Sequence, residues 1–142
     1  MTTFICNTCG QRAVFRMRQH RLALCKEHYL EWVVNQTQRF IEKYHMFSRD
    51  ERILVAVSGG KDSLALWDVL WRLGYEVEGM YIHLGIDRDM AYSDESERYA
   101  VDFAQQRGLK LHIVNIQEQH KQTIPELAKL STRGKHKPCS VC

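Results

Sequence analysis

The chain has 142 residues, of which 44% are hydrophobic and 26% are charged, the mixture typical of a globular domain. This composition excludes a disordered tail, a collagen-like fibre and a coiled coil. No apolar run approaches the roughly 18 residues of a membrane-spanning helix, and the amino terminus shows no secretory signal, so we expect a cytoplasmic protein. The formal net charge of +3 permits a phosphate-rich partner without requiring one.

Cysteines dominate the first 28 residues. In a reducing compartment, the five cysteines of the chain are better candidates for metal or redox chemistry than for disulfides. Two pairs with the spacing of tetrahedral zinc ligands are present: Cys6 and Cys9, then Cys25 and His28. Four protein ligands close the coordination shell, so residues 1–28 are predicted to form a structural zinc knuckle. Gly10 is expected to supply a positive φ in the turn after Cys9.

The predicted knuckle is also basic. Its positively charged or titratable side chains are Arg12, Arg16, Arg18, His20 and Arg21. Zinc knuckles occur in nucleic-acid-binding proteins, and these side chains could contact phosphates. A solvated basic surface explains the same residues equally well, so both interpretations stay open.

An amphipathic helix is predicted over residues 29–45, followed by a polar linker up to residue 52. Apolar side chains at helical spacing form one stripe: Leu30, Val33, Val34, Thr37, Phe40, Ile41 and Tyr44. Residues 29–52 would therefore connect the knuckle to the next domain.

From residue 53 the pattern alternates between strands and helices. We predict strands over 53–57, 77–84 and 109–116 and helices over 63–73 and 93–107, with Gly74 ending the first of these helices. The wholly apolar run over 53–57 predicts a strand buried on both faces. Residues 53–142 are therefore expected to form an α/β domain with a parallel sheet, whose ligands bind at the carboxyl ends of the strands.

The first predicted strand leads directly into Ser58-Gly-Gly-Lys-Asp-Ser63 and then into a helix. Backbone N–H groups, the helix dipole and the small glycines make such a turn an anion-binding site. Val55 stands where a Walker A loop needs glycine, and Asp62 stands where it needs Ser or Thr. The dinucleotide glycine fingerprint does not fit either.

This loop resembles the PP-loop of the ATP pyrophosphatase superfamily (adenine nucleotide alpha hydrolase-like fold). The resemblance implies cleavage of ATP between its α and β phosphates and transfer of AMP to an oxygen of the substrate. It implies that pyrophosphate is held by Ser58, Gly59, Gly60, Lys61, Asp62 and Ser63. Asp62 would help to place Mg²⁺, and adenine would lie near Ala56 and Ile82. His83, at a predicted strand end, is interpreted as a packed or solvent-facing residue rather than a base.

A second cysteine pair, Cys139 and Cys142, follows a basic stretch. In an α/β protein it could be a dithiol redox pair, two metal ligands, or chance. Neighbouring cations lower thiol pKa values and so favour thiolate. Two cysteines alone do not hold an iron–sulfur cluster.

The order of a Cys₃His knuckle, an amphipathic helix, a PP-loop and a late cysteine pair resembles the tRNA 2-thiouridine synthetases of the TtuA/TtcA family, with Leu22–Leu30 and Val55–Trp67 closest to TtuA. The resemblance implies that ATP adenylates the C2 oxygen of a tRNA uridine, with the T-loop favoured. Sulfur from a ubiquitin-like carrier or a comparable donor then displaces AMP. It implies a 4Fe-4S cluster with Cys139 and Cys142 among its ligands, catalytic roles for both, and a homodimer.

The family's third cluster cysteine has no counterpart in these residues, so the PP-loop domain is expected to be incomplete. The chain as written should bind zinc, bind ATP weakly at most, and not thiolate tRNA. Three alternatives remain: another PP-loop adenylating enzyme, a non-enzymatic zinc module that docks on tRNA or a partner, and a dithiol oxidoreductase.

Overall fold

The computed structural model describes residues 4–86 and 92–131. The chain divides into two compact units, Met1–Arg49 and Asp50–Cys142. Among the described residues, no helix combines the length and apolar character that crossing a bilayer requires.

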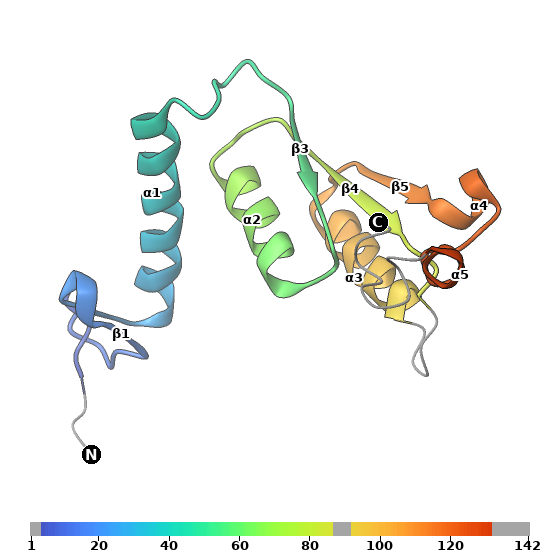
Figure 1. Cartoon of the computed structure of the whole chain (residues 1–142). Coiled ribbons are helices and arrows are strands. Elements are labelled where there is room, and N and C mark those ends of the chain that lie inside the picture. Colours follow the sequence, from blue (N-terminus) through green and yellow to red (C-terminus); the bar gives the residue numbers. More distant parts are fainter. Residues whose placement is uncertain (1–3, 87–91, 132–142) are drawn as a thin grey trace. The chain divides into compact units, whose positions relative to one another are not determined.

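The first unit is a small hairpin followed by one long helix (Figure 1). Strands β1 (Phe15–Met17) and β2 (Leu22–Leu24) pair in antiparallel fashion across a 3-10 turn, Arg18–His20. A backbone bridge between Ile5 and Arg12 closes the preceding loop. The cysteine spacing predicts a metal-binding knuckle in this segment. The structure shows that a β-hairpin, which the spacing does not predict, forms part of it.

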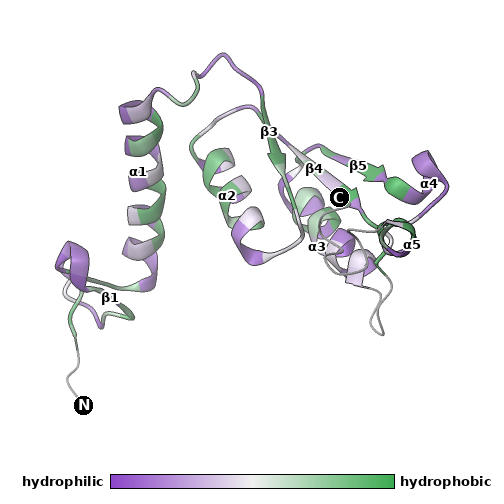
Figure 2. Cartoon of the chain, in the orientation of Figure 1, coloured by the Kyte–Doolittle hydropathy of each residue, from purple (hydrophilic) through white to green (hydrophobic). Residues whose placement is uncertain are grey.

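Helix α1 (Lys26–Tyr44) begins three residues before the predicted start, so His28 lies within its first turn. Apolar residues follow one side of the helix, as Figure 2 shows. Most of this stripe is not part of a core: Ile41 is buried, whereas Leu30 and Tyr44 are 52% and 60% exposed. The periodicity therefore predicted the helix correctly but not how much of its stripe is buried.

The second unit is a parallel sheet with helices. Its elements are β3 (Ile53–Ala56), α2 (Lys61–Arg72), β4 (Val77–His83), α3 (Tyr92–Arg107), β5 (Leu111–Asn115), α4 (Ile116–His120) and α5 (Ile124–Leu130). The strands pair in the order β3-β4-β5, all parallel, with Val55 opposite Gly79 and Gly79 opposite Leu111. The predicted parallel α/β fold is confirmed. Helices α4 and α5 were not predicted.

One face of this sheet carries the core. Val55, Val57 and Tyr81 are each at most 5% exposed there, and Trp67 of α2 is fully buried. Gly79 makes this packing possible, because a Cβ at that position would lie 2.4 Å from the Trp67 ring. Because the central strand β4 has no side chain at Gly79, the large Trp67 ring has room to pack there.

The opposite face is open in the described part of the chain, and this corrects a prediction. The run 53–57 was expected to be buried on both faces, but Leu54 is 54% exposed and Ala56 is also exposed. In a parallel sheet whose successive strands are added in one direction, right-handed crossovers place the connecting helices on the same face of the sheet. Helices α2 and α3 accordingly both cover one face (Figure 1).

Candidate nucleotide site and metal centre

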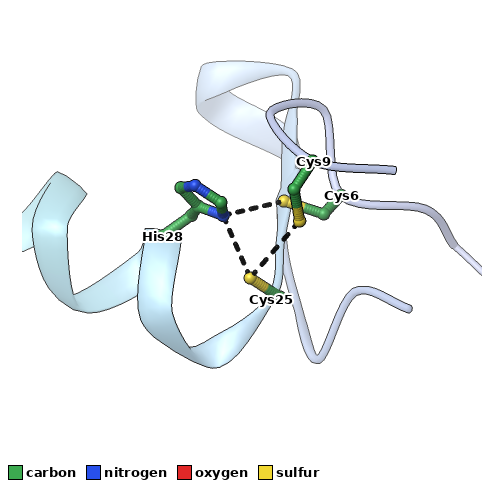
Figure 3. Close-up of side chains that lie close together, drawn as sticks. All are labelled: Cys6, Cys9, Cys25 and His28. Atoms are coloured by element: carbon green, nitrogen blue, oxygen red, sulfur yellow. Dashed lines mark hydrogen bonds between the residues drawn. The ribbon is translucent and has the colours of Figure 1, made fainter. Parts of the chain in front are cut away.

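Four potential metal ligands converge in the first unit, as Figure 3 shows. The ligand atoms of Cys6, Cys9, Cys25 and His28 all lie within 4.8 Å of one another. Cys6 and Cys9 come from the loop before the hairpin, Cys25 is the N-cap of α1, and His28 lies in its first turn. The spacing selected these four residues from the sequence, and the fold brings all of them together.

The distances suit a tetrahedral metal ion. Zinc bonds of about 2.3 Å to sulfur and about 2.0 Å to nitrogen place neighbouring ligand atoms about 3.5 to 3.8 Å apart. Cys9 Sγ lies 3.9 Å from Cys25 Sγ, and Cys6 Sγ lies 3.6 Å from His28 Nδ1. The Cys25 Sγ to His28 Nδ1 distance of 3.1 Å is slightly shorter. The cluster can therefore accept an ion with small side-chain adjustments.

Backbone groups favour a thiolate in this cluster. Burial opposes ionisation of the Cys6 thiol, but hydrogen bonds from the backbone of Cys25, Cys9 and Thr8 lower its pKa to about 6. The pKa of Cys25 is raised to about 11: a backbone hydrogen bond at His28 lowers it, and burial together with Glu27 and the other two thiols outweighs this. Cys6 is thus poised to ionise, whereas ionisation of Cys25 is opposed until a cation compensates the charge.

The hairpin holds the ligands through its own backbone. The N–H of Asn7 donates to the Ala23 carbonyl at 2.9 Å, and the Ala23 N–H donates to Asn7 Oδ1 at 2.6 Å. Gly10 has φ +73°, which confirms the positive φ expected for the turn after Cys9. Cys6, Leu24 and Cys25 form the buried centre, with Met17, Leu22, Tyr29 and Trp32 packed around it.

The loop Ser58–Ser63 runs from the end of β3 into the first turn of α2, at the carboxyl end of the sheet. The N–H of Val57 donates to the Met80 carbonyl at 2.8 Å, so the sheet pairing extends to the edge of the loop. Gly59 turns the chain with φ +73°, and Gly60 begins α2 without a side-chain cap. The backbone N–H groups of the first helical turn are thereby left for an anion.

Polar side chains surround this turn. Ser58 Oγ and Ser63 Oγ lie 3.2 Å apart, and Ser63 Oγ also donates to the Gly60 carbonyl at 3.1 Å. Lys61 Nζ and Asp62 Oδ1 pair at 2.6 Å with side chains 88% and 89% exposed. In such exposure the ion pair contributes little stability, so both groups are free to turn toward a phosphate or a cation.

The sequence did not reveal what supports the loop from behind. A Cβ at Gly59 would lie 2.2 Å from the Ser96 carbonyl oxygen, so the loop rests directly on the backbone of α3. The start of α3 is in turn held by Tyr81, whose hydroxyl donates to the Ser93 carbonyl at 2.7 Å. Burial, reinforced by Glu97, raises the pKa of Tyr81, so this donor keeps its proton.

His83 belongs to the same junction. Its Nε2 lies 2.9 Å from Asp94 Oδ1, and its Nδ1 accepts from the Gly85 N–H at 3.3 Å. Both ring nitrogens are engaged, which agrees with the interpretation of His83 as a packed residue. The pair joins the end of β4 to the first turn of α3.

The remaining predicted site residues divide into two groups. Ala56 and Ile82 are both exposed near the carboxyl ends of β3 and β4, on the open face of the sheet. Cys139 and Cys142 lie outside the described residues.

A parallel sheet with a glycine turn between a strand and an uncapped helix defines a nucleotide-binding α/β domain. Residues 29–134 match the family model described as "PP-loop domain", and residues 5–30 match the one described as "2-thiouridine synthetase TtuA, N-terminal LIM domain". The chain therefore belongs to the PP-loop family and carries a TtuA-type amino-terminal segment, as the motif order had indicated.

Similar proteins agree with this assignment. The chain is 51% identical over 97% of its length to the tRNA-5-methyluridine(54) 2-sulfurtransferase of Thermus thermophilus, and 40% identical over 96% to that of Pyrococcus horikoshii. It spans 41% and 42% of these relatives. The U34-tRNA thiolase NcsA from Methanococcus maripaludis, solved with its 4Fe-4S cluster, superposes with a TM-score of 0.78 at 21% identity, covering 99% of this chain and 46% of that one. This last likeness supports the fold.

Proposed function

We propose that this chain supplies the ATP-binding and adenylating part of a tRNA uridine 2-thiolation enzyme. The observation that carries the proposal is the Ser58–Ser63 loop, which combines an uncapped helix start, a positive-φ glycine and two facing hydroxyls. The names of the similar Thermus and Pyrococcus proteins favour the T-loop uridine at tRNA position 54 as the substrate.

The loop suits the departure of pyrophosphate. Backbone N–H groups at the start of α2 and the hydroxyls of Ser58 and Ser63 would bind the β and γ phosphates. Lys61 would neutralise the charge that develops on the leaving group, and Asp62 would hold Mg²⁺ through a carboxylate oxygen. Adenine would lie over the open face of the sheet near Ala56 and Ile82. The C2 oxygen of uridine attacks the α phosphate, pyrophosphate leaves, and a sulfur nucleophile then displaces AMP from C2.

Zinc is the proposed metal of the knuckle. Three thiolates and one imidazole at tetrahedral distances are zinc ligands, and the absence of an open coordination position makes the site structural. The ion would hold the loop before β1 to the start of α1.

For a 4Fe-4S cluster we propose Cys139 and Cys142 as two ligands, since NcsA carries such a cluster. When bound there, such a cluster would supply a binding site for the sulfur that is transferred. Two thiolates do not complete the ligand set, so we derive no step through it. A ubiquitin-like sulfur carrier, a homodimer and a cytoplasmic location complete the proposal.

The test measures tRNA thiolation by the natural gene product at its full length. Unmodified tRNA, ATP, Mg²⁺ and a sulfide donor should yield 2-thiouridine and one AMP per thiolated base. Asp62→Ala should abolish AMP release while tRNA binding persists, and Asp50→Ala, outside the loop, serves as the matched control. AMP release that does not depend on tRNA, or a tRNA product other than 2-thiouridine, would indicate that the chain is part of another PP-loop adenylating enzyme. Equal activity of both variants would refute the role of the loop.

A further inference from the structure

The amino-terminal segment carries an uncompensated positive charge. Residues 1–25 contain four arginines and no aspartate or glutamate. Arg12, Arg16, Arg18 and Arg21 are all exposed. Among the described residues, every ion pair of the chain involves other cations, so these four guanidinium groups have no carboxylate partner there.

The hairpin gathers three of these arginines at one groove. Arg16 lies opposite Ala23 in the β1–β2 pairing, and both residues line the groove. The 3-10 turn ends at Arg21, whose φ of +52° reverses the chain and keeps Arg18 and Arg21 beside each other. The resulting groove has a volume of about 530 Å³ and is lined by Phe4, Ile5, Arg16, Arg18 and Arg21, among others.

An aromatic ring accompanies the charges. The Arg16 guanidinium carbon lies 4.2 Å from the centroid of the Phe4 ring, and Phe4 is 38% exposed. A guanidinium plane stacked on a ring is a surface on which a nucleobase can extend the stack. Arg18 and Arg21 offer planar donor groups that match phosphate geometry. An acidic peptide would use the charges but not the stacking surface, so the combination favours RNA.

We propose that this groove, defined by Phe4, Arg16, Arg18 and Arg21, is a binding surface for the tRNA backbone and one unpaired base. The proposal deepens the proposed function and rests on tRNA being the substrate. It assigns a second role to the knuckle: the four clustered Cys and His side chains shape the hairpin, and the groove of the hairpin binds RNA.

The test is fluorescence anisotropy of a labelled, unmodified tRNA transcript with the zinc-loaded chain at several salt concentrations. The double variant Arg18→Ala/Arg21→Ala removes two phosphate contacts, so the slope of log K against log salt should fall in magnitude by about 1.4 to 1.8. At low salt its Kd should rise at least tenfold. Phe4→Leu should raise Kd severalfold without changing the slope, because it removes stacking and no charge.

The matched control is Arg39→Ala/Lys43→Ala, which removes the same charge from exposed positions of α1 in the same unit. Zinc content and circular dichroism establish that all variants fold. The proposal is overturned if the original chain does not bind tRNA, or if the control loses as much affinity and slope as the groove variant. This experiment measures tRNA binding and not thiolation. A failure of the groove prediction would therefore leave the proposed adenylating role untouched, and a loss of thiolation in the enzymatic assay would leave the binding result untouched.

Discussion

Gly59 and Gly60 stand side by side in the nucleotide loop, but a methyl group would meet different surroundings at each. Gly59 has φ +73°, and its Cβ would lie 2.2 Å from the Ser96 carbonyl oxygen. Gly60 has an ordinary φ of −79°, and its Cβ would lie 3.4 Å from Ser58 Oγ. The sequence motif does not distinguish the two glycines. Their different surroundings are visible only in the folded structure.

Gly59→Ala should therefore destabilise the second unit by about 2 to 4 kcal/mol, since backbone strain adds to a clash with fixed backbone. It should also weaken ATP binding. Gly60→Ala is the matched control and should change stability by less than about 1 kcal/mol. Urea unfolding followed by tryptophan fluorescence measures both. Equal effects of the two substitutions would show that α3 does not support the loop.

At the scale of elements, helix α5 was not predicted, although its sequence contains a local helix-start signal. Thr123 and Glu126 form a reciprocal capping box, and Pro125 follows at the start of the helix. This pattern is a known helix-start signature. The loop after β4 packs against this cap, because a Cβ at Gly85 would lie 2.5 Å from Thr123 Cγ2. The cap thus anchors α5 beside the carboxyl end of the sheet.

Thr123→Ala should cost about 1 kcal/mol of stability, and Thr123→Ser, which keeps the hydroxyl, should cost less. Hydrogen bonds from the Thr123 backbone and side chain lower the pKa of Glu126. Its contribution is therefore present above the ordinary pKa of a glutamate and lost as pH falls through the lowered value. Glu126→Gln should lower the melting temperature at pH 7 but not below about pH 3. A difference independent of pH would contradict the role of the carboxylate.

On the scale of the whole molecule, the two units have separate sources of stability. The centre of the first consists of Cys6, Leu24 and Cys25, too small a core for an independent fold without metal. The second has a core around the fully buried Trp67. Removal of the zinc ion proposed for the knuckle should therefore affect the two units unequally.

A strong chelator should unfold the first unit and leave the second folded. The expected readout is loss of dispersed amide signals from residues 4–44, with those of the sheet retained in nuclear magnetic resonance spectra. Cys6→Ser should reproduce this loss and abolish zinc binding, whereas Cys139→Ser, outside the knuckle, should do neither. Simultaneous collapse of both sets of signals would contradict independent stability.

The sequence by itself determined which Cys and His side chains cluster as candidate metal ligands, where the glycine loop lies, and that the sheet is parallel. These features depend on short-range spacing: two Cys or His residues three apart, six consecutive loop residues, and apolar runs of strand length. Such patterns restrict the local backbone so strongly that distant contacts change little. Even the positive φ of Gly10 followed from its place after Cys9.

Tertiary structure decided which faces are covered and what supports the loop. Nothing in the run over 53–57 distinguishes Val55, which is buried, from Leu54, which is 54% exposed, because both are apolar. The direction in which strands are added to the sheet determines where the helices lie. The contact of Gly59 with Ser96 likewise arises from packing between distant residues, which no local pattern specifies.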